Sequence, residues 1–388
     1  MSEICTAGTE AKRDCQVTVT RAKSIEIKID TTNRNLLVAG IRAVVEETVA
    51  ALGVKGARVD VVDSGALDYV VSARVEAALR MAIHELEVEP LAVKRNPTAR
   101  DRLRRTRLYA PGNNPRLLVG IELHNADCVL LDLEDSVPPA EKYAARILVK
   151  HLLAALRFPE VWVRINPLDT YGRDDLAEVL RAQPHGVCLP KAEFAASINE
   201  LDEELTRLEG EYGIPQGSTH IMPIIETAKG LLHCEGVAAA NKRVVILAFG
   251  AEDFTRDLGA KRTQESLLFA RSMIVASAKA SEVQASDTVY PNVEDEEGLI
   301  AEARLARDLG FDGKGVINPR QIEPIHAVFS PSEQEIEQAR RIVAAAEEAE
   351  TQGIGAIAIG GKMIDRPVLK RAQRTLKLAG LIEKGGAQ

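Results

Sequence analysis

The chain has 388 residues, of which 46% are hydrophobic and 27% are charged, with a formal net charge of −8. This composition is typical of a soluble globular protein and excludes a disordered chain. The length favours a large domain with a smaller module, and the negative charge gives no reason to expect a nucleic-acid partner. No apolar run is long enough to cross a bilayer.

The five cysteines are scattered and show no metal-ligand spacing: Cys5, Cys15, Cys128, Cys188 and Cys234. Three of them lie in or beside apolar segments, so they are interpreted as small buried groups in a reducing cytosol. The first residues lack the basic segment followed by an apolar core that marks a secreted protein. The sequence therefore predicts a cytoplasmic protein.

Residues 1–88 are predicted to form a small α+β domain. Three of its segments alternate apolar and polar residues as half-buried strands do: 15–20, 24–29 and 57–62. Residues 36–52 carry apolar side chains at helical spacing and stop at Gly53, and a second helical stripe covers 67–83. The pattern alone indicates an interaction module.

Residues 89–104 are polar and contain proline and arginine, which is typical of a linker. Residues 105–330 then contain eight apolar runs separated by helical stretches. Their spacing is that of one strand-helix unit, and eight such units close a (β/α)₈ TIM barrel of the α/β class. The runs are 106–110, 128–133, 161–165, 186–189, 220–225, 244–249, 284–289 and 314–317.

Residues 331–388 lie beyond the eighth run and are expected to form a C-terminal helical lid. A charged helical segment, 332–349, is followed by a glycine-rich loop and a final amphipathic helix. Because the barrel is already closed, this tail must pack over an end of its own barrel or of a neighbour's.

Charged residues follow the predicted strands at their carboxyl ends, which meet at one rim of a barrel. The acids are Asp132, Glu134, Asp135, Glu226, Glu252 and Asp253, and the bases are Arg164 and Lys191. Such a rim indicates a metal site beside an anion site, because Glu226 and Asp253 suit a hard divalent cation with open coordination positions. The alternative is that these charges are only salt-bridged strand ends, but they would then be scattered over both ends of the barrel.

A turn, Pro111-Gly-Asn-Asn-Pro115, follows the first barrel strand. It offers free backbone donors and little side-chain bulk, which suits a phosphate-bearing ligand. An ordinary tight turn is the alternative interpretation.

Several motifs lie in register from Arg105 to the end of the chain: Arg107-Leu-Tyr-Ala-Pro-Gly, Leu131-Asp-Leu-Glu-Asp-Ser-Val137, Val163-Arg-Ile-Asn166, Leu189-Pro-Lys191, Ile225-Glu-Thr-Ala228, Gly250-Ala-Glu-Asp253, Ile317-Asn-Pro-Arg-Gln-Ile322 and Gly361-Lys-Met-Ile-Asp365. In these motifs the chain resembles the β subunit of bacterial citrate lyase and the malyl-CoA and citramalyl-CoA lyases, within the HpcH/HpaI aldolase superfamily.

The first domain resembles the acyl carrier protein, or γ subunit, of citrate lyase. The matching motifs are Ala7-Gly-Thr9, Gly40-Ile-Arg42, Leu52-Gly-Val54, Ser64-Gly-Ala-Leu-Asp68 and Ala73-Arg-Val-Glu-Ala-Ala78. In that family a serine three residues after Ala-Gly-Thr carries a CoA-like arm, whereas this chain has Lys12 there. The resemblance therefore implies a carrier fold without a covalent prosthetic arm, and a free CoA thioester as substrate.

The resemblance also implies a role for each candidate residue. Glu226 and Asp253 would bind Mg²⁺ or Mn²⁺, and Arg164 would hold the oxo-acid oxygen or the thioester carbonyl. Asp365 matches a lid aspartate that handles the proton at the acetyl carbon, often across a subunit boundary. Glu134 would be a third catalytic residue, which orients metal-bound water. The supporting residues around the metal would be Asp135, Asp132, Lys191 and Glu252. The CoA phosphates would meet Arg107, Pro111, Gly112, Asn113 and Arg320.

The implied reaction is a retro-Claisen cleavage of citramalyl-CoA, malyl-CoA or citryl-CoA into acetyl-CoA and a 2-oxo acid. A homo-oligomer, a trimer or a hexamer, is expected. Three alternatives stay open: a citryl-carrier lyase that acts on a separate carrier protein, a 2-oxo-acid aldolase that needs no CoA, and a non-catalytic scaffold of a lyase complex.

Overall fold

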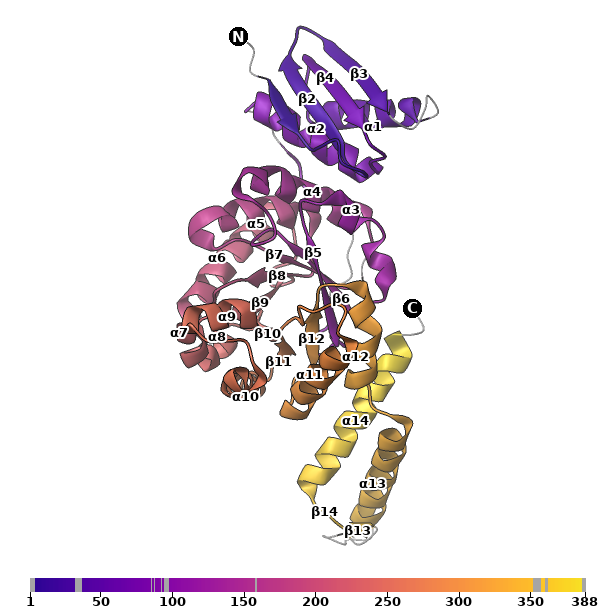
Figure 1. Cartoon of the computed structure of the whole chain (residues 1–388), viewed down its shortest axis with the longest axis vertical. Helices are drawn as coiled ribbons and strands as arrows, with labels where there is room; N and C mark the ends of the chain where they lie inside the picture. Colours follow the sequence, from indigo (N-terminus) through magenta and orange to yellow (C-terminus); the bar gives the residue numbers. More distant parts are fainter. Residues whose placement is uncertain are drawn as a thin grey trace.

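The computed structural model describes residues 4–31, 37–84, 86, 88–91, 93, 98–157, 159–351, 357–359 and 362–385. Figure 1 shows a small α+β domain at one end of the long axis, a barrel in the middle and a helical hairpin at the other end. No helix in the described part of the chain combines the length and apolarity that a membrane crossing requires.

The first domain is a four-stranded sheet covered by two helices. Its strands are β1 (Cys5–Ala7), β2 (Cys15–Arg21), β3 (Ile25–Thr31) and β4 (Ala57–Asp63), in the order β1-β2-β4-β3. The helices are α1 (Val38–Ala51) and α2 (Asp68–Ala82). Every predicted element is confirmed. Strand β1 was not predicted, because three residues are too few to show a period of two.

The barrel is closed by eight parallel strands in sequence order. They are β5 (Thr106–Pro111), β6 (Cys128–Asp132), β7 (Val161–Arg164), β8 (Gly186–Leu189), β9 (His220–Ile225), β10 (Ile246–Phe249), β11 (Gln284–Asp287) and β12 (Gly313–Val316). All eight predicted strands are confirmed. Their side chains are mostly buried because helices cover the outside and other strands face the inside.

The helices around the barrel are α3 (Pro115–Leu118), α4 (Lys142–Ala155), α5 (Arg173–Val179), α6 (Ala195–Glu211), α7 (Ala228–Leu232), α8 (Cys234–Ala239), α9 (Ala251–Leu258), α10 (Gln264–Ala280), α11 (Glu296–Leu309) and α12 (Ile322–Phe329). The short turns are 121–124, 139–141, 168–172, 180–182 and 319–321. Helix α9 starts directly after β10, which places its first-turn acids at the rim.

The arginines before β5 tie the linker to the amino-terminal end of the barrel. Arg104 donates two hydrogen bonds of 2.8 Å to the fully buried carboxylate of Glu160. Arg105 pairs with Asp127 at 2.9 Å. Arg104 and Arg105 therefore close the floor of the barrel, each paired with a carboxylate.

The first domain is docked on the barrel through α2 and α4, and the contact is ionic and buried. Lys150 of α4 is fully buried and lies 2.5 Å from Glu76 of α2 and 2.6 Å from Glu178 of α5. Arg80 bridges the same two carboxylates at 2.9 and 2.8 Å, and His151 lies 2.6 Å from Glu76. Burial alone would raise the pKa of Glu76, but His151 and Lys150 outweigh it and hold this pKa well below its usual range.

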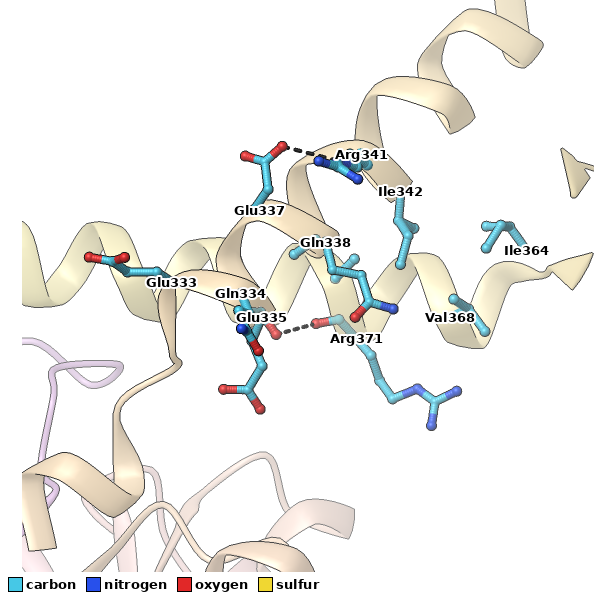
Figure 2. A pocket seen from close by; sticks show the side chains of 13 residues that line it. Glu333, Gln334, Glu335, Glu337, Gln338, Arg341, Ile342, Ile364, Val368 and Arg371 are labelled. Atoms are coloured by element: carbon cyan, nitrogen blue, oxygen red, sulfur yellow. Dashed lines mark hydrogen bonds and ion pairs between the residues drawn. The ribbon is translucent and has the colours of Figure 1, made fainter. Parts of the chain in front are cut away.

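The tail forms a hairpin of α13 (Glu333–Thr351), β13 (Ile357–Ile359), β14 (Lys362–Ile364) and α14 (Arg366–Gly385). Figure 2 shows Ile342 of α13 beside Ile364 and Val368, in the apolar space between the two helices. Later turns of α14 dock on the floor of the barrel, where Arg374 pairs with Asp312 at 2.8 Å. The tail thus packs on its own barrel at the amino-terminal end, and its far end extends away (Figure 1).

The docking network predicts a large loss of stability when its central cation is removed. We expect Lys150→Met to lower the free energy of unfolding by about 3 kcal/mol, because it leaves Glu76 and Glu178 buried with less positive charge between them. Denaturant unfolding followed by circular dichroism measures the change.

A matched control is Lys55→Met, the same substitution at an exposed lysine of the first domain. This substitution should change the free energy of unfolding by less than about 0.5 kcal/mol. Equal effects of the two substitutions would show that the buried network does not hold the domains together.

Candidate functional site

A cavity of about 420 Å³ opens at the carboxyl ends of the barrel strands. We call it the rim cavity. The residues that line it come from seven of the eight strand ends, among them Pro111, Asp132, Arg164, Glu226, Asp253, Thr288 and Ile317. The rule that charged residues after barrel strands meet at one end therefore holds for this chain.

Arg164 and Asp132 form the central ion pair of the rim cavity. They are register partners on β7 and β6, and the guanidinium donates to the two carboxylate oxygens at 2.6 and 2.8 Å. Burial would lower the pKa of Arg164, but Asp132 outweighs it, so this pKa lies well above its usual value. The same guanidinium lies 3.0 Å from Glu134 and 3.4 Å from Asp135. The positive charge is thus permanent and fixed in direction.

Lys191 connects the carboxylates around Arg164 to Glu226. Its ammonium lies 2.8 Å from Glu134, and its backbone N–H donates to the Oε1 atom of Glu226 at 2.8 Å. Burial raises the pKa of Glu134, although Arg164 and Lys191 oppose the shift. These contacts hold Glu134 between two cations and aim Glu226 at the cavity.

Glu226 is a buried carboxylate at the end of β9, with 2% of its surface exposed. Burial raises its pKa to about 8; Arg164 opposes the shift, and the negative charges of Asp253 and Glu134 add to it. A Cβ atom at Gly250 would lie 2.5 Å from the Oε2 atom of Glu226, so only glycine leaves room for this carboxylate. Asp253, in the first turn of α9, pairs with Arg256 at 2.5 Å.

The donor set of Glu226 and Asp253 fits a hard divalent cation. All donors are oxygens. Burial is the main cause of the raised pKa of Glu226, and the repulsion by Asp253 that adds to it is what a bound cation would remove. In the residues that the structure describes, no three or more histidine, cysteine, aspartate or glutamate side chains form a complete metal cage. Two carboxylates leave further coordination positions for water and substrate.

The turn after β5 is tightly packed against the end of β6. The N–H of Gly112 donates to the carbonyl of Asp132 at 2.7 Å, and a Cβ atom there would lie 2.8 Å from that oxygen. Asn113 donates to Glu141 at 2.6 Å, and its carbonyl accepts a 3.4 Å bond from Arg74 of the first domain. Pro111 lines the rim cavity, whereas Asn113 faces the first domain.

Two of the arginines expected to meet phosphate lie elsewhere. Arg107 is 1% exposed, inside the barrel, where it donates to Ser286 and, at 3.2 Å, to Tyr109. This buried position does not fit phosphate binding. The side chain of Arg320 is 77% exposed and pairs with Glu294 at 3.6 Å, outside the residues that line the rim cavity.

Glu252 and Asp365 are the remaining candidates. Glu252 lines the rim cavity, and its exposed carboxylate pairs with Arg262 at 2.8 Å. Asp365 is exposed and accepts a 3.0 Å bond from the N–H of Val368, so it caps α14. It follows β14, at the end of the hairpin that Figure 1 shows farthest from the barrel. In a single chain the structure does not bring Asp365 to the rim.

The sequence interpretation missed Tyr109. Its ring lies 5.3 Å from the guanidinium carbon of Arg107 and 5.8 Å from that of Arg164, and the residue lines the rim cavity. Burial raises the pKa of Tyr109, although Arg107 opposes the shift. The sequence did carry a signal for Tyr109. Residues two apart on a strand share one face, and the candidate residue Pro111 lies two positions after Tyr109.

Two family models match the chain. The model for HpcH/HpaI aldolase/citrate lyase matches residues 105–319, which is more than half of the chain. The model for the malonate decarboxylase delta subunit matches residues 3–82. The two matches coincide with the barrel and with the first domain.

Among curated relatives, the citrate lyase subunit beta of Leuconostoc mesenteroides subsp. cremoris is 44% identical over 284 residues, which is 72% of this chain and 94% of the relative. The human mitochondrial citramalyl-CoA lyase is 35% identical over 297 residues, 72% of this chain and 87% of the relative. A Mycobacterium tuberculosis protein, solved in complex with magnesium, acetoacetate and coenzyme A, aligns with a TM-score of 0.61 and 33% identity, over 73% of this chain and 100% of that one. By sequence and by structure, this chain belongs to the HpcH/HpaI aldolase/citrate lyase family.

Proposed function

We propose that the chain is a carbon–carbon lyase that cleaves a 3-hydroxyacyl-CoA thioester into acetyl-CoA and a 2-oxo acid. The observation that carries the proposal is the pair Glu226 and Asp253 facing the fixed cation Arg164 in one cavity. Relatives named citrate lyase subunit beta and citramalyl-CoA lyase support this reaction type. All five cysteines are free thiols, which fits the expected cytosolic location.

Glu226 and Asp253 would hold Mg²⁺ or Mn²⁺, as the magnesium complex of the solved relative supports. When bound, the ion supplies a Lewis acid next to the oxygen on which negative charge develops during cleavage. Residues of the chain fix the orientation of the metal ligands. Lys191 fixes Glu226 through its backbone N–H, and Gly250 leaves the other carboxylate oxygen without a side chain in front of it.

Arg164 would bind a substrate oxygen, either the oxo-acid oxygen or the thioester carbonyl. Its two bonds to Asp132 fix the plane of the guanidinium, so little conformational freedom is lost when a substrate oxygen arrives. The part of the rim cavity beside this charge is apolar and formed by Ile224, Phe249 and Val289. This division suits a substrate with an anionic end and a carbon chain.

Asp365 would complete the site from a neighbouring copy of the chain. In one chain, α14 is attached to the barrel floor at Arg374, and Asp365 lies nine residues earlier, about 14 Å further out along the helix. The acids of the rim cavity are at the opposite end of the barrel. A homo-oligomer, a trimer or a hexamer, in which each hairpin reaches the next rim would supply the aspartate.

The acyl group is a citramalyl, malyl or citryl group in this proposal. The aldolase alternative, which needs no CoA, finds no specific support in the structure. Turnover of a panel of acyl-CoA thioesters with Mg²⁺, with acetyl-CoA release as the readout, tests the choice. Cleavage of the free hydroxy acid at the same rate would instead favour the aldolase.

Loss of either proposed metal ligand should abolish activity without unfolding the chain. We expect Glu226→Gln and Asp253→Asn to lower kcat more than about a hundred-fold, because the cation loses one of two carboxylates. EDTA should inactivate the unmodified protein, and Mg²⁺ should restore it. Glu235→Gln, at an exposed acid on α8, is the matched control and should leave kcat unchanged. Full turnover by either variant in EDTA would reject the metal site.

A mixing experiment tests whether Asp365 acts in a neighbouring chain. Asp365→Asn and Glu226→Gln should each be inactive alone. Random mixed oligomers should recover activity in roughly a quarter of the sites, because some rims combine an intact Glu226 with an intact Asp365 from the next chain. Activity after mixing, unfolding and refolding measures the recovery. No recovery, with mixed oligomers present, would place Asp365 in its own chain's site or outside catalysis.

The intact mass of the purified chain should equal the mass of its amino acids, 42.1 kDa, with no phosphopantetheine-type addition. The reason is that Lys12 has no hydroxyl group to form a phosphodiester. Mass spectrometry of the protein and of the peptide that contains Lys12 measures this. A covalent arm on any residue of the first domain would contradict the free-thioester proposal.

A further inference from the structure

A second cavity, of about 370 Å³, lies between the first domain and the barrel. We call it the interface cavity. Its wall on the first domain includes Thr9 and Lys12 from the β1–β2 loop and Arg74 from α2. Its wall on the barrel includes Asn114 after β5 and Glu141 after β6. Neither domain forms this cavity alone.

The interface cavity and the rim cavity are adjacent because the same two barrel loops line both. After β5, Pro111 and Leu117 line the rim cavity, whereas Asn114 between them lines the interface cavity. After β6, Ser136 lines the rim cavity and Glu141 lines the interface cavity. Two residues, Gly112 and Asn113, separate Pro111 from Asn114, and the Cα atoms of Pro111 and Asn114 are at most about 11 Å apart. One extended ligand can therefore reach from the rim into the interface cavity.

The β1–β2 loop is held in one conformation beside the barrel. Asp14 is buried and accepts bonds from the N–H and hydroxyl of Thr9 at 3.1 and 3.0 Å. Arg74 donates to both oxygens of Asp14 at 2.9 and 3.1 Å. Arg13 has φ 73°, an uncommon conformation for a non-glycine residue, and its N–H is bonded to Ser64 at 3.0 Å. The loop is thus built to present the residues between Thr9 and Arg13.

Lys12 is the cation that the interface cavity leaves available. The charge of Arg74 is balanced by Asp14, and Glu141 is bonded to Asn113. Lys12 is exposed, lines the cavity and has no ion pair or hydrogen bond to any residue that the structure describes. An ammonium group on a flexible stem beside an amide side chain is suited to a phosphate oxygen.

We infer that the interface cavity binds the phosphate end of the CoA thioester, with Lys12 as a phosphate ligand and Asn114 as an amide donor. This inference rests on the proposed function, because the acyl end of the same molecule must occupy the rim cavity. The pantetheine arm separates the thioester from the phosphates and would cross the turn between Pro111 and Asn114. The first domain then forms part of the substrate site without a covalent bond to the substrate.

The test is calorimetric binding of CoA and of pantetheine to the full chain in the presence of Mg²⁺. Lys12→Glu should raise the Kd of CoA about ten-fold or more, because a phosphate ligand becomes a repelling charge. Pantetheine, which has no phosphate, should bind the variant and the unmodified chain equally. Lys55→Glu makes the same charge change at an exposed lysine of the same domain that does not line the cavity, and should leave both Kd values unchanged.

Equal CoA affinity of Lys12→Glu and the unmodified chain would overturn the inference and leave the proposed function standing. A parallel loss of pantetheine affinity would also overturn it, because the effect of Lys12 would then not act on phosphate. An unmodified chain that binds no CoA would reject the proposed function itself. High salt should weaken CoA binding to the unmodified chain more than to Lys12→Glu.

Discussion

The ion pair between Arg164 and Asp132 is the interaction on which the rim depends. Both groups lie in the wall of the barrel, and a guanidinium there without a carboxylate partner would cost several kcal/mol. Once paired, the arginine still attracts Glu134, and Lys191 connects Glu134 to the backbone contact that aims Glu226. Acids and bases therefore alternate around the rim, and each charge is held in place by the next. Burial raises the pKa of Glu226 to about 8, and the negative charges of Asp253 and Glu134 add to this shift.

The sequence was sufficient to predict the barrel and most of its rim. Eight buried runs could be counted because parallel strands covered on both faces are apolar along their whole length. A charge at the carboxyl end of such a run lies at the rim of the barrel, so the positions of Asp132, Arg164 and Glu226 were predicted correctly. A charge near the start of a run is ambiguous, and Arg107 lies inside the barrel beside Gly315, its register partner on β12. Only the three-dimensional structure reveals its partners there, Ser286 and Tyr109.

Contacts between distant segments could not be predicted in the same way. Periodicity indicates which face of α2 is buried, but not that Glu76 meets Lys150, 74 residues further along the chain. In the structure α2 is buried on nearly every side, charged residues included, because the barrel covers the helix face that the first domain leaves open. The sequence also did not show on which end of the barrel the tail packs. Its charged helices are compatible with either end of the barrel, and the choice depends on individual pairs such as Arg374 with Asp312.

The buried ions between α2 and α4 have a consequence for how substrates travel. A carrier domain works by leaving one active site for another, which requires a weak interface that opens and closes. Here each departure would expose Lys150 and Glu76 to water. It would also break contacts of 2.5 to 2.8 Å that Glu76 makes with Lys150 and His151, and that Arg80 makes with Glu178. The domain therefore stays where it is. In the proposed function, acyl groups would arrive and leave as diffusing small molecules, so supply would depend on the cellular concentration of the thioester and not on the reach of a tether.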